Sequence, residues 1–590
     1  MPKASYYEAF DARTRYHQSR MRLASGDASD PRDEEEFGQG LDLIRILFVA
    51  VLAVVVARLV WLQVIDAPNL ASQAESNRTN VVTLRAKRGT IYDRNGNVLA
   101  MSVDCKTIYA NPKEVHDPSG VAGVLASHLG GSASDYLSVL TRDTTFAYVQ
   151  RQVDEDVAAD VKAELASKEL TGIYYLEDSK REYPYGAVAG QVLGVVGADG
   201  QGLTGLEYYY DETLTGTDGQ MIMETGLTGT PIAGGVNQVT DAKDGTDIVV
   251  SLDVDLQQKA EGELEAAVEE YEAESGSVCV MNPQTGEIYA ACSTPLADIT
   301  DLANTSSDAL GLKLVTNSYE PGSVFKVLTT SIGIEAGAFD QNTSYNIPVT
   351  IQVGDDTVSD DDSRSEWMYM SLREMMRRSS NVAMAYLVQN VMGAKTFADG
   401  VAGYGIGSKT GIDYPGESSG IVKSYEEYDG STAGFMSFGQ SVSVPMIQIA
   451  RAYACVANDG TLVIPHFMIQ KDGQDVSWPT SKGPISKKTA DEETDMMRYV
   501  MTNGTGKLGQ VEGYDIAGKT GTGEQASEEG SYESFRYVAS LCGFANADDP
   551  EVLVYVGLNG VPHLASQSAA PLFATVMSEA LTDLSIPPTS

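Results

Sequence analysis

The apolar pattern of the chain changes abruptly near its N-terminus. Residues 46–57 form an unbroken apolar run, and apolar residues continue around it from 43 to 65. A stretch of about 20 such residues is long enough for an α-helix to cross a bilayer. Arg45 and Arg58 interrupt the stretch, but long side chains near helix ends can reach the lipid headgroups. The pattern therefore predicts one transmembrane helix at residues 41–65.

Positive charge lies on the N-terminal side of this helix. Residues 1–45 hold seven Lys and Arg, whereas residues 66–85 hold two. Because positively charged flanks stay in the cytoplasm, we expect a single-pass anchor with the N-terminus cytoplasmic and the rest of the chain extracytoplasmic. No small-residue cleavage site follows the helix, which favours an uncleaved signal anchor. The polar segment 1–40 contains a run of glutamates, and we expect it to be a disordered tail.

Beyond the anchor, residues 66–245 mix strand and helix patterns. An Asn-Gly pair within residues 91–100 predicts a β-hairpin with a type I′ turn. Valine or leucine recurs every fourth position from 157 to 165, behind three acidic residues, and predicts an amphipathic helix. No constellation of titratable side chains occurs here, so we expect this part to have a structural or docking role.

Residues 246–590 have the pattern of one α/β unit. Strand-like runs lie near its start and its end, at 247–252, 278–281, 288–291, 515–518, 537–544 and 552–556. Helical patterns lie between and after them, at 255–272, within 323–450 and at 568–581. Strands at both ends with helices between them predict one sheet covered by helices. The expected fold class is α/β (α+β).

Composition and charge remove several classes of function. The chain of 590 residues has a formal charge of −41, which argues against a nucleic-acid-binding surface. Residues 66–590 hold 33 Lys and Arg against 73 Asp and Glu, so nearly all of this charge lies on the expected extracytoplasmic side. The five His show no metal-ligand spacing, and the five Cys form no C-x-x-C pair. Whether Cys279 and Cys292 pair across their predicted hairpin stays open.

Ser323 and Lys326 form the sharpest local motif. If a helix begins at Ser323, Lys326 lies beside it on the same face. A serine is a weak nucleophile at neutral pH and needs an adjacent base, which a lysine can supply once burial disfavours its charged form. Free backbone N–H groups at a helix N-terminus also favour a developing oxyanion. Ser-x-x-Lys is common by chance, so this motif alone does not establish catalysis.

Two later motifs change this interpretation. Residues 379–381 read Ser-Ser-Asn between two helical stretches, and residues 519–522 read Lys-Thr-Gly-Thr at the end of a predicted strand. Alone, the first could be a helix cap and the second a solvated strand end. A second Lys-Thr-Gly at 409–411 lies in a glycine-rich loop with no strand before it. We therefore assign Lys519 to the site and Lys409 to a loop.

The ordered set Ser-x-x-Lys, Ser-x-Asn and Lys-Thr-Gly resembles the penicillin-binding protein and serine β-lactamase superfamily. Other segments are similar to class B penicillin-binding proteins, namely 88–100 (RGTIYDRNGNVLA), 205–207 (GLE), 282–286 (NPQTG), 410–417 (TGIDYPGE) and 438–440 (FGQ). The resemblance covers nearly everything after residue 40. It implies a penicillin-binding transpeptidase domain at 246–590 and a mixed α/β dimerisation (pedestal) domain at 66–245.

The resemblance also implies a role for each residue of the first two motifs. Ser323 would attack the penultimate D-Ala carbonyl of a peptidoglycan stem peptide, and Lys326 would take the serine proton. Ser379 would relay a proton to the leaving amine, while Asn381 would align the substrate amide and Lys326. An amine of a neighbouring stem peptide would then resolve the acyl-enzyme into a cross-link. A β-lactam would imitate the donor and remain attached.

For the third motif, the resemblance implies contacts with the substrate carboxylate. Lys519, Thr520, Gly521 and Thr522 would form this part of the site. The backbone N–H groups of Ser323 and Thr522 would form the oxyanion hole. The family makes no use of a metal or an organic cofactor in this reaction.

The sequence departs from related families in ways that bear on activity. Ser380 stands where class A β-lactamases have an Asp, and no Glu-x-x-Leu-Asn occurs between Asn381 and Lys519. Both departures favour a transpeptidase over a β-lactam hydrolase. After Thr522 the chain continues Gly-Glu-Gln at 523–525, where many relatives have Ala, which leaves the geometry of the strand end open.

The resemblance suggests partners and leaves alternatives. The partners would be stem peptides, β-lactams, a separate SEDS-family glycosyltransferase and other divisome membrane proteins. Glu320 before Pro321 and Gly322 favours the septal, FtsI/SpoVD-like branch over an elongation-type class B transpeptidase. A β-lactam sensor usually has several membrane spans, and this chain predicts one. A non-catalytic divisome scaffold is disfavoured by the intact set of three motifs.

Overall fold

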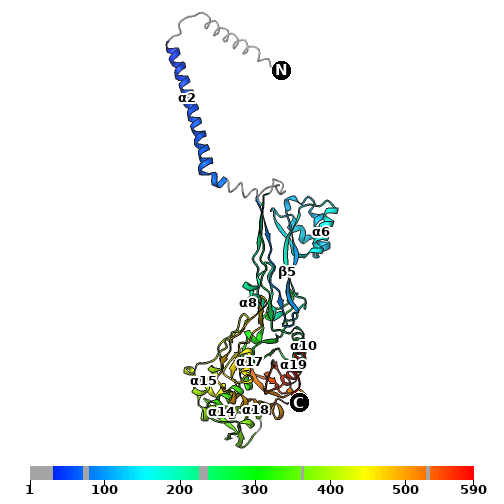
Figure 1. The fold of residues 1–590 in the computed structure, drawn as a ribbon, viewed down its shortest axis with the longest axis vertical. Helices are drawn as coiled ribbons and strands as arrows, with labels where there is room; N and C mark the ends of the chain where they lie inside the picture. The colour runs from blue at the N-terminus through cyan, green and yellow to red at the C-terminus, as the bar shows by residue number, and fades with distance from the viewer. Residues whose placement is uncertain (1–30, 71–78, 225–236, 361–363, 527–531, 590) are drawn as a thin grey trace. The chain divides into compact units, whose positions relative to one another are not determined.

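The computed structural model of the chain describes residues 31–70, 79–224, 237–360, 364–526 and 532–589 (Figure 1). The chain divides into two compact units. One unit consists of residues 1–82 and 220–240, and the other of residues 83–219 and 241–590.

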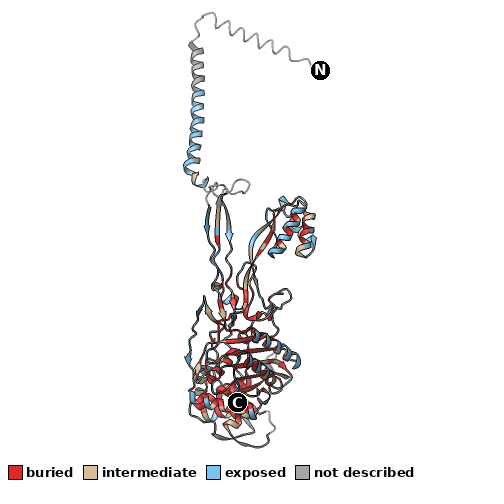
Figure 2. Cartoon of the chain, turned by 45° about the vertical axis from the view of Figure 1, so that its right-hand side comes forward, coloured by how far each residue is buried: buried red, intermediate tan, exposed pale blue. Residues whose placement is uncertain are grey.

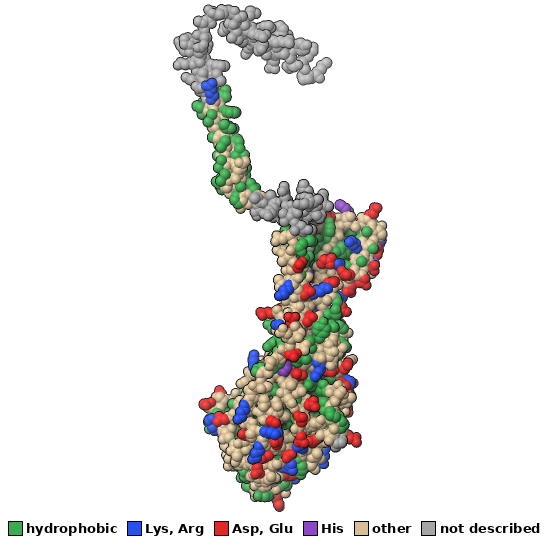
Figure 3. All heavy atoms as spheres, in the orientation of Figure 1, with side chains coloured by type: hydrophobic (Ala, Val, Ile, Leu, Met, Phe, Trp, Pro, Cys, Tyr) green, Lys and Arg blue, Asp and Glu red, His purple; other side chains and the backbone are tan. Residues whose placement is uncertain are grey.

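The first unit contains the apolar segment. Helix α2 spans Pro31–Val60 and continues as a π-helical turn, Trp61–Ile65. Within the described residues, one helix is long and apolar enough to cross a membrane, at Leu43–Ile65, and green apolar side chains cover it in Figure 3. The helix begins ten residues before the predicted anchor, so residues 31–40 are helical where we expected disorder; residues 1–30 lie outside the described residues. The same unit has a sheet of order β1-β6-β7 (Thr79–Leu84, Gly219–Glu224 and Asn237–Thr240).

The N-terminal part of the second unit is built on a seven-stranded sheet. Its order is β19-β18-β8-β2-β3-β4, and β5 pairs with β3. The strands span Ile91–Tyr92 (β2), Val98–Ala110 (β3), Ala147–Asp154 (β4), Ile173–Glu182 (β5), Ile248–Val250 (β8), Met468–Lys471 (β18) and Gln474–Asp475 (β19). The strand expected at 247–252 is therefore real, but it joins this sheet through a parallel pairing with β2 instead of the sheet of the α/β unit.

The predicted hairpin at 91–100 forms, but its turn type is wrong. A type I′ turn needs positive φ at two residues, and of this turn only Gly96 has one, at 86°. The carboxylate of Asp93 accepts hydrogen bonds from the backbone N–H groups of Asn95 and Asn97, both at 2.8 Å. This side chain holds a wider turn than the Asn-Gly pair alone predicts.

Three helices cover one face of strands β3–β5. They are α4 (Pro118–Leu129), α5 (Ala133–Leu140) and α6 (Glu155–Ser167). Helix α6 confirms the amphipathic pattern, because Val161 and Leu165 are buried in a cluster with Ile108 of β3. The apolar face of each helix therefore meets the sheet, as the period of the pattern requires.

A buried ion-pair network lies beside this sheet. Both carboxylate oxygens of Glu207 are used, one by Arg88 Nε at 2.5 Å and one by Arg181 Nε at 2.6 Å. Arg88 also donates to Asp211 at 2.6 Å. The Glu207 side chain is fully buried, and the two arginines are 7% and 4% exposed. The network gives Arg88 and Glu207, from the sequence segments 88–100 and 205–207, a shared structural role.

The sheet of the α/β unit has five strands in the order β10-β9-β23-β22-β21. They span Ser275–Met281 (β9), Ile288–Ser293 (β10), Ile516–Ala526 (β21), Tyr532–Ala545 (β22) and Leu553–Val561 (β23). Neighbouring strands are antiparallel, and strands from the two ends of the unit lie together as predicted. Residues of α10 (Val254–Glu270) and α19 (Ala569–Asp583) share one core cluster with the sheet. Figure 2 shows how buried residues gather in these layers.

Six further helices of seven residues or more share a core cluster with the opposite face of the sheet. They are α12 (Lys326–Glu335), α13 (Leu372–Arg378), α14 (Asn381–Leu387), α15 (Ala394–Gly403), α17 (Met446–Ala457) and α18 (Lys487–Asn503). The three motifs of the sequence analysis lie at the ends of α12, α13 and α14 and on strand β21. The fold thus places one edge of the sheet against a bundle of helix ends.

The cysteines do not form disulfides. All five are free and buried. Cys279 and Cys292 lie on paired strands, but Cys279 belongs to the core cluster on the helical side and Cys292 to the cluster with α10 and α19. Their thiols therefore lie on opposite faces of the hairpin, which answers the question that the sequence left open. Burial raises the pKa of Cys279 to about 12.

Candidate active site

Ser323 lies in a 3₁₀ turn, Gly322–Phe325, which leads directly into α12 at Lys326. The expected α-helix therefore begins three residues later than Ser323. Gly322 has a φ of 59°, and a Cβ added there would lie 3.2 Å from the backbone N of Gly523. Only a glycine fits this close approach without strain. This turn carries the predicted nucleophile and is called the nucleophile turn; it consequently touches the strand that carries the third motif.

Lys326 is completely buried and joins the first motif to the second. Its Nζ donates to the backbone carbonyl of Ser379 at 2.5 Å and to Asn381 Oδ1 at 2.6 Å. It also lies 3.2 Å from Ser379 Oγ. The amine is thus held in one position by groups from two different helix ends.

The Ser-Ser-Asn motif is a tight turn between α13 and α14. Ser379 adopts a left-handed conformation with φ 57° and ψ 40°, which is uncommon for a residue other than glycine. Ser380 caps α14, and its Oγ accepts the N–H of Ala383 at 3.0 Å. The cap stabilises the turn, and the polar atoms of Ser379 and Asn381 point toward Lys326.

Asp360 supports this turn and was missed by sequence reasoning. Its carboxylate accepts Ser380 Oγ–H at 2.7 Å and the N–H of Val382 at 3.0 Å. Arg364 pairs with it at 2.6 Å, and the two side chains are 6% and 8% exposed. Asp360 lies 20 residues before the motif, in a segment with no recognisable pattern, so no local signal could have identified it.

Lys519 lies on β21, which is an edge strand of the sheet. It is fully buried, and its Nζ donates to Ser379 Oγ at 2.9 Å and to the carbonyl of Thr520 at 2.8 Å. Two lysines therefore share the hydroxyl of Ser379. Burial lowers the pKa of Lys519 well below its ordinary value, and the charge of Lys326 lowers it further.

The rest of the third motif packs against the nucleophile turn. A Cβ on Gly521 would lie 3.0 Å from the carbonyl of Pro321, so a glycine lets β21 approach this closely. Thr520 Oγ1 is 2.5 Å from Thr505 Oγ1, in the loop after α18, and Thr522 Oγ1 accepts the N–H of Ala565 at 3.3 Å. Because alternate residues of a strand point their N–H groups to the same side, Thr520 and Thr522 share one edge.

Of two further sequence segments, one supports the site and the other lies away from it. Gly322 N–H donates to the carbonyl of Gly439 at 3.1 Å, so the Phe-Gly-Gln segment supports the nucleophile turn. The second Lys-Thr-Gly lies away from the cluster: Lys409 is exposed in a loop, and Thr410 donates to Glu417 at 2.6 Å. Within the described part of the chain, no group of three or more His, Cys, Asp or Glu side chains could hold a metal ion.

The structure thus brings Lys326, Ser379, Asn381 and Lys519 into one hydrogen-bonded cluster beside Ser323. Family models match two parts of the chain, and the whole cluster lies in one of them. The model for "Penicillin binding protein transpeptidase domain" matches residues 276–578, and the model for "Penicillin-binding Protein dimerisation domain" matches residues 83–250. The chain belongs to the penicillin-binding protein transpeptidase family.

This penicillin-binding protein is similar to characterised relatives over most of its length. It is 32% identical over 570 residues to stage V sporulation protein D of Bacillus subtilis (strain 168), covering 92% of this chain and 86% of that protein. It is 28% identical to peptidoglycan D,D-transpeptidase FtsI of Escherichia coli (strain K12), covering 96% of each. The crystal structure of penicillin binding protein 2X from Streptococcus thermophilus matches with a TM-score of 0.71 and 28% identity, covering 86% and 80%.

These similarities confirm the resemblance and the expected fold class. The mixed α/β transpeptidase fold and the N-terminal dimerisation domain are both present in the penicillin-binding protein. Below, "dimerisation domain" means residues 83–250 and "transpeptidase domain" means residues 276–578.

Proposed function

We propose that this chain is a class B peptidoglycan D,D-transpeptidase that forms an acyl-enzyme at Ser323. The observation that carries the proposal is the buried amine of Lys326, one turn from Ser323 and bound to Ser379 and Asn381. A serine next to a buried amine has the base that it needs for nucleophilic attack. The names of its relatives, which include a peptidoglycan D,D-transpeptidase, support the substrate class.

In the first step, Ser323 Oγ forms a bond with the penultimate D-Ala carbonyl carbon of a stem peptide, and Lys326 takes the hydroxyl proton. Two ammonium charges around one hydroxyl repel each other, so the pair Lys326 and Lys519 favours a state with one neutral amine. A neutral amine is the form that a general base requires. The backbone N–H groups of Ser323 and Thr522 would stabilise the oxyanion.

In the second half of this step, the carbon–nitrogen bond to the terminal D-Ala breaks and the departing amine gains a proton. Ser379 Oγ lies within hydrogen-bond distance of both lysine amines, so it can pass a proton from Lys326 to the leaving group. Asn381 would align the substrate amide. An amine of a second stem peptide then attacks the ester, restores Ser323 and leaves a peptide cross-link.

The third motif would bind the terminal carboxylate. Lys519, Thr520 and Thr522 supply an amine and two hydroxyls from strand β21, and Gly521 lets this strand pack directly against the nucleophile turn. A β-lactam presents a carboxylate and a reactive carbonyl in a similar arrangement. It would acylate Ser323 and stay attached, because its leaving group is tethered to the acyl-enzyme.

Labelling with a fluorescent penicillin tests the proposal. The full chain in detergent is labelled, digested and mapped, and the adduct is expected on the peptide that contains Ser323. Ser323→Ala is expected to abolish labelling. An adduct on another residue, or one that survives this substitution, would overturn the assignment.

We also propose a septal role and a single-pass membrane anchor. The support is the apolar helix Leu43–Ile65, the excess of positive charge before it and the similarity to stage V sporulation protein D and to FtsI. The N-terminus would then be cytoplasmic, and a SEDS-family glycosyltransferase and divisome proteins would be membrane partners. A reporter active only in the cytoplasm should work at the N-terminus and fail at the C-terminus. Depletion in cells should block division rather than elongation.

A further inference from the structure

Gln191 of the dimerisation domain has its side chain inside the transpeptidase domain. It lies in α7 (Gly190–Leu193) and is 3% exposed. Its Nε2 donates to the carbonyls of Ala309 at 2.8 Å and Pro295 at 3.1 Å, and its Oε1 accepts the N–H of Ser293 at 2.8 Å. One side chain therefore fixes three backbone positions of the other domain.

Tyr414 extends this anchor by one more backbone group. Its hydroxyl donates to the carbonyl of Gln191 at 2.7 Å and accepts the N–H of Leu312 at 3.2 Å. Tyr414 belongs to the sequence segment 410–417, which the proposed catalytic cluster does not include. Ala309 and Leu312, three residues apart, are thus both tied to Gln191.

The chain runs from Leu312 to the nucleophile through a short connection. Helix α11 (Lys313–Thr316) and strand β11 (Ser318–Tyr319) lead to Ser323, and β11 pairs for two residues with β16 (Val444–Pro445). No longer element intervenes. The position of Ser323 is therefore linked to that of Leu312 through about ten residues of backbone.

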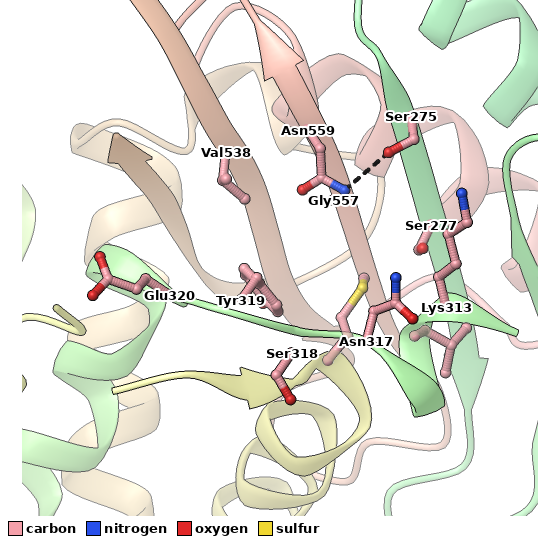
Figure 4. A pocket seen from close by; sticks show the side chains of 12 residues that line it. Ser275, Ser277, Lys313, Asn317, Ser318, Tyr319, Glu320, Val538, Gly557 and Asn559 are labelled. Carbon is pink, nitrogen blue, oxygen red and sulfur yellow. Dashed lines mark hydrogen bonds between the residues drawn. The ribbon is translucent and has the colours of Figure 1, made fainter. Parts of the chain in front are cut away.

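A cavity lies along this connection. Its volume is about 310 Å³, and residues 313–320 form one wall, while strands β9, β22 and β23 and helix α17 supply the rest (Figure 4). Figure 4 shows Lys313, Asn317, Ser318, Tyr319 and Glu320 along one ribbon that passes across the strands. Leu314 and Val315 pack in the core, whereas Asn317, Ser318 and Glu320 line the cavity. The two ends of the connection are held by the hydrogen bonds of Leu312 and Gly322.

At the end of the connection next to Ser323, the packing allows little displacement of the backbone. A Cβ on Gly439 would lie 2.1 Å from the carbonyl oxygen of Gly322, so these two backbones are in direct contact. A displacement of about 1 Å at reacting groups can cost about 100-fold in rate. Because these backbones leave little free space, a change in the path of the connection would strain the contacts of this turn or change the position of Ser323.

We propose that Gln191 and Tyr414 are positioning residues for acylation, which hold the connection so that Ser323 faces Lys326. The proposal rests on the proposed role of Ser323. It makes the dimerisation domain part of the catalytic apparatus, because Gln191 belongs to that domain and acts on the nucleophile through Ala309 and Leu312.

The interface offers a matched control. Tyr210 of the dimerisation domain also donates across the interface, to Asp413 Oδ2 at 2.6 Å, and both groups are buried. Asp413 in turn accepts the N–H groups of Phe467 and Met468, and neither lies on the connection. Tyr210→Phe therefore removes one interdomain hydrogen bond of similar burial without touching residues 309–323.

The experiment compares Tyr414→Phe, Gln191→Met and Tyr210→Phe in the full chain in detergent. The acylation rate with a fluorescent penicillin is separated into binding and chemical steps, and thermal unfolding is recorded alongside. Tyr414→Phe and Gln191→Met are expected to lower the acylation rate constant about tenfold, the size expected for loss of a buried hydrogen bond, with binding unchanged. Tyr210→Phe should lower the melting temperature and leave the acylation rate within about twofold of the wild type.

Hydrogen exchange adds a readout that does not depend on activity. Backbone amides of residues 312–320 should exchange faster in Tyr414→Phe than in Tyr210→Phe. The inference is overturned if Tyr414→Phe acylates at the wild-type rate, or if Tyr210→Phe slows acylation equally. Absence of an adduct on Ser323 in the wild type would instead overturn the proposed function.

Discussion

Two buried clusters of charge in this protein have opposite designs. In the dimerisation domain, Arg88 and Arg181 share the carboxylate of Glu207, so each positive charge faces a negative one. In the transpeptidase domain, Lys326 and Lys519 converge on the hydroxyl of Ser379, and the acceptors described for them are a hydroxyl, carbonyls and an amide. The side chains of Arg88, Glu207, Lys326 and Lys519 are buried.

This difference in charge balance indicates a different role for each cluster. Opposite charges with matched hydrogen bonds compensate their desolvation, and such a network specifies one arrangement of the chain. Two buried amines repel each other and destabilise their own charged forms, which is costly for folding and useful for proton transfer. The first cluster should therefore control stability and the second should control the rate of acylation.

Glu207→Gln should have the largest effect and acts on stability. It leaves the buried Arg181 without its carboxylate and Arg88 with Asp211 alone, so the free energy of unfolding should fall by about 3–5 kcal/mol. Denaturant unfolding of the full chain in detergent measures this change. The protein that remains folded should acylate at the wild-type rate. Slower acylation per folded molecule would contradict the separate roles of the two clusters.

A surface ion pair provides the control for this substitution. Lys395 and Asp399 pair one helical turn apart on α15, with side chains 60% and 61% exposed. Asp399→Asn removes the same charge type from a solvated position. It should leave the free energy of unfolding nearly unchanged, because exposed pairs contribute little.

Lys519→Met should have the next largest effect and acts on rate. The substitution keeps most of the side-chain volume and removes the amine that binds Ser379 Oγ, so acylation should slow by about 10²–10³-fold. Stability should not fall as it does in Glu207→Gln, because a repulsive buried charge is removed. Lys409→Met, in the exposed Lys-Thr-Gly, should acylate normally. Equal effects of the two substitutions would mean that the wrong motif was assigned to the site.

Substitution of Glu261 should have the smallest effect. It extends the comparison of buried charges to the pH dependence of the free energy of unfolding. This carboxyl accepts the N–H of Ala189 and the amide of Gln257, and burial raises its pKa from 4.5 to about 7. The folded chain holds this proton more tightly than the unfolded chain. The resulting stability is fully present below pH 4.5 and is lost as the pH rises through 7, which amounts to about 3 kcal/mol.

Glu261→Gln should remove this pH dependence. The difference between the unfolding free energies of the variant and the wild type should grow in the variant's favour between pH 4.5 and pH 8. A constant difference over this range would show that the carboxyl titrates normally in the folded protein.

The sequence was most informative where a motif and an element boundary coincide. Ser323, Ser379 and Lys519 each stand at the start or end of a helix or on a strand that the apolar pattern predicts. Their order along the chain was sufficient to place them in one site. The five-stranded sheet was predictable for the same reason, because strong apolar runs lie at both ends of the unit.

Contacts between distant segments were not predictable. Asp360 supports the Ser-Ser-Asn turn from a segment without a pattern, and Gln191 reaches Ala309 from another domain. Strand β8 reads as part of the α/β unit, but it pairs with the distant strand β2 within the dimerisation domain. The type I′ turn was wrong because Asp93 stabilises another turn, and a carboxylate two residues away is invisible to a dipeptide rule.

The edge position of β21 has one more consequence. A strand with an unpaired outer side offers its N–H and C=O groups to any extended chain. A stem peptide bound there would become a further strand of the sheet, joined through main-chain hydrogen bonds. Such binding depends first on the spacing and direction of peptide groups and only then on side chains. The protein would therefore tolerate wide variation in the middle of its donor peptide while demanding strict geometry at its end.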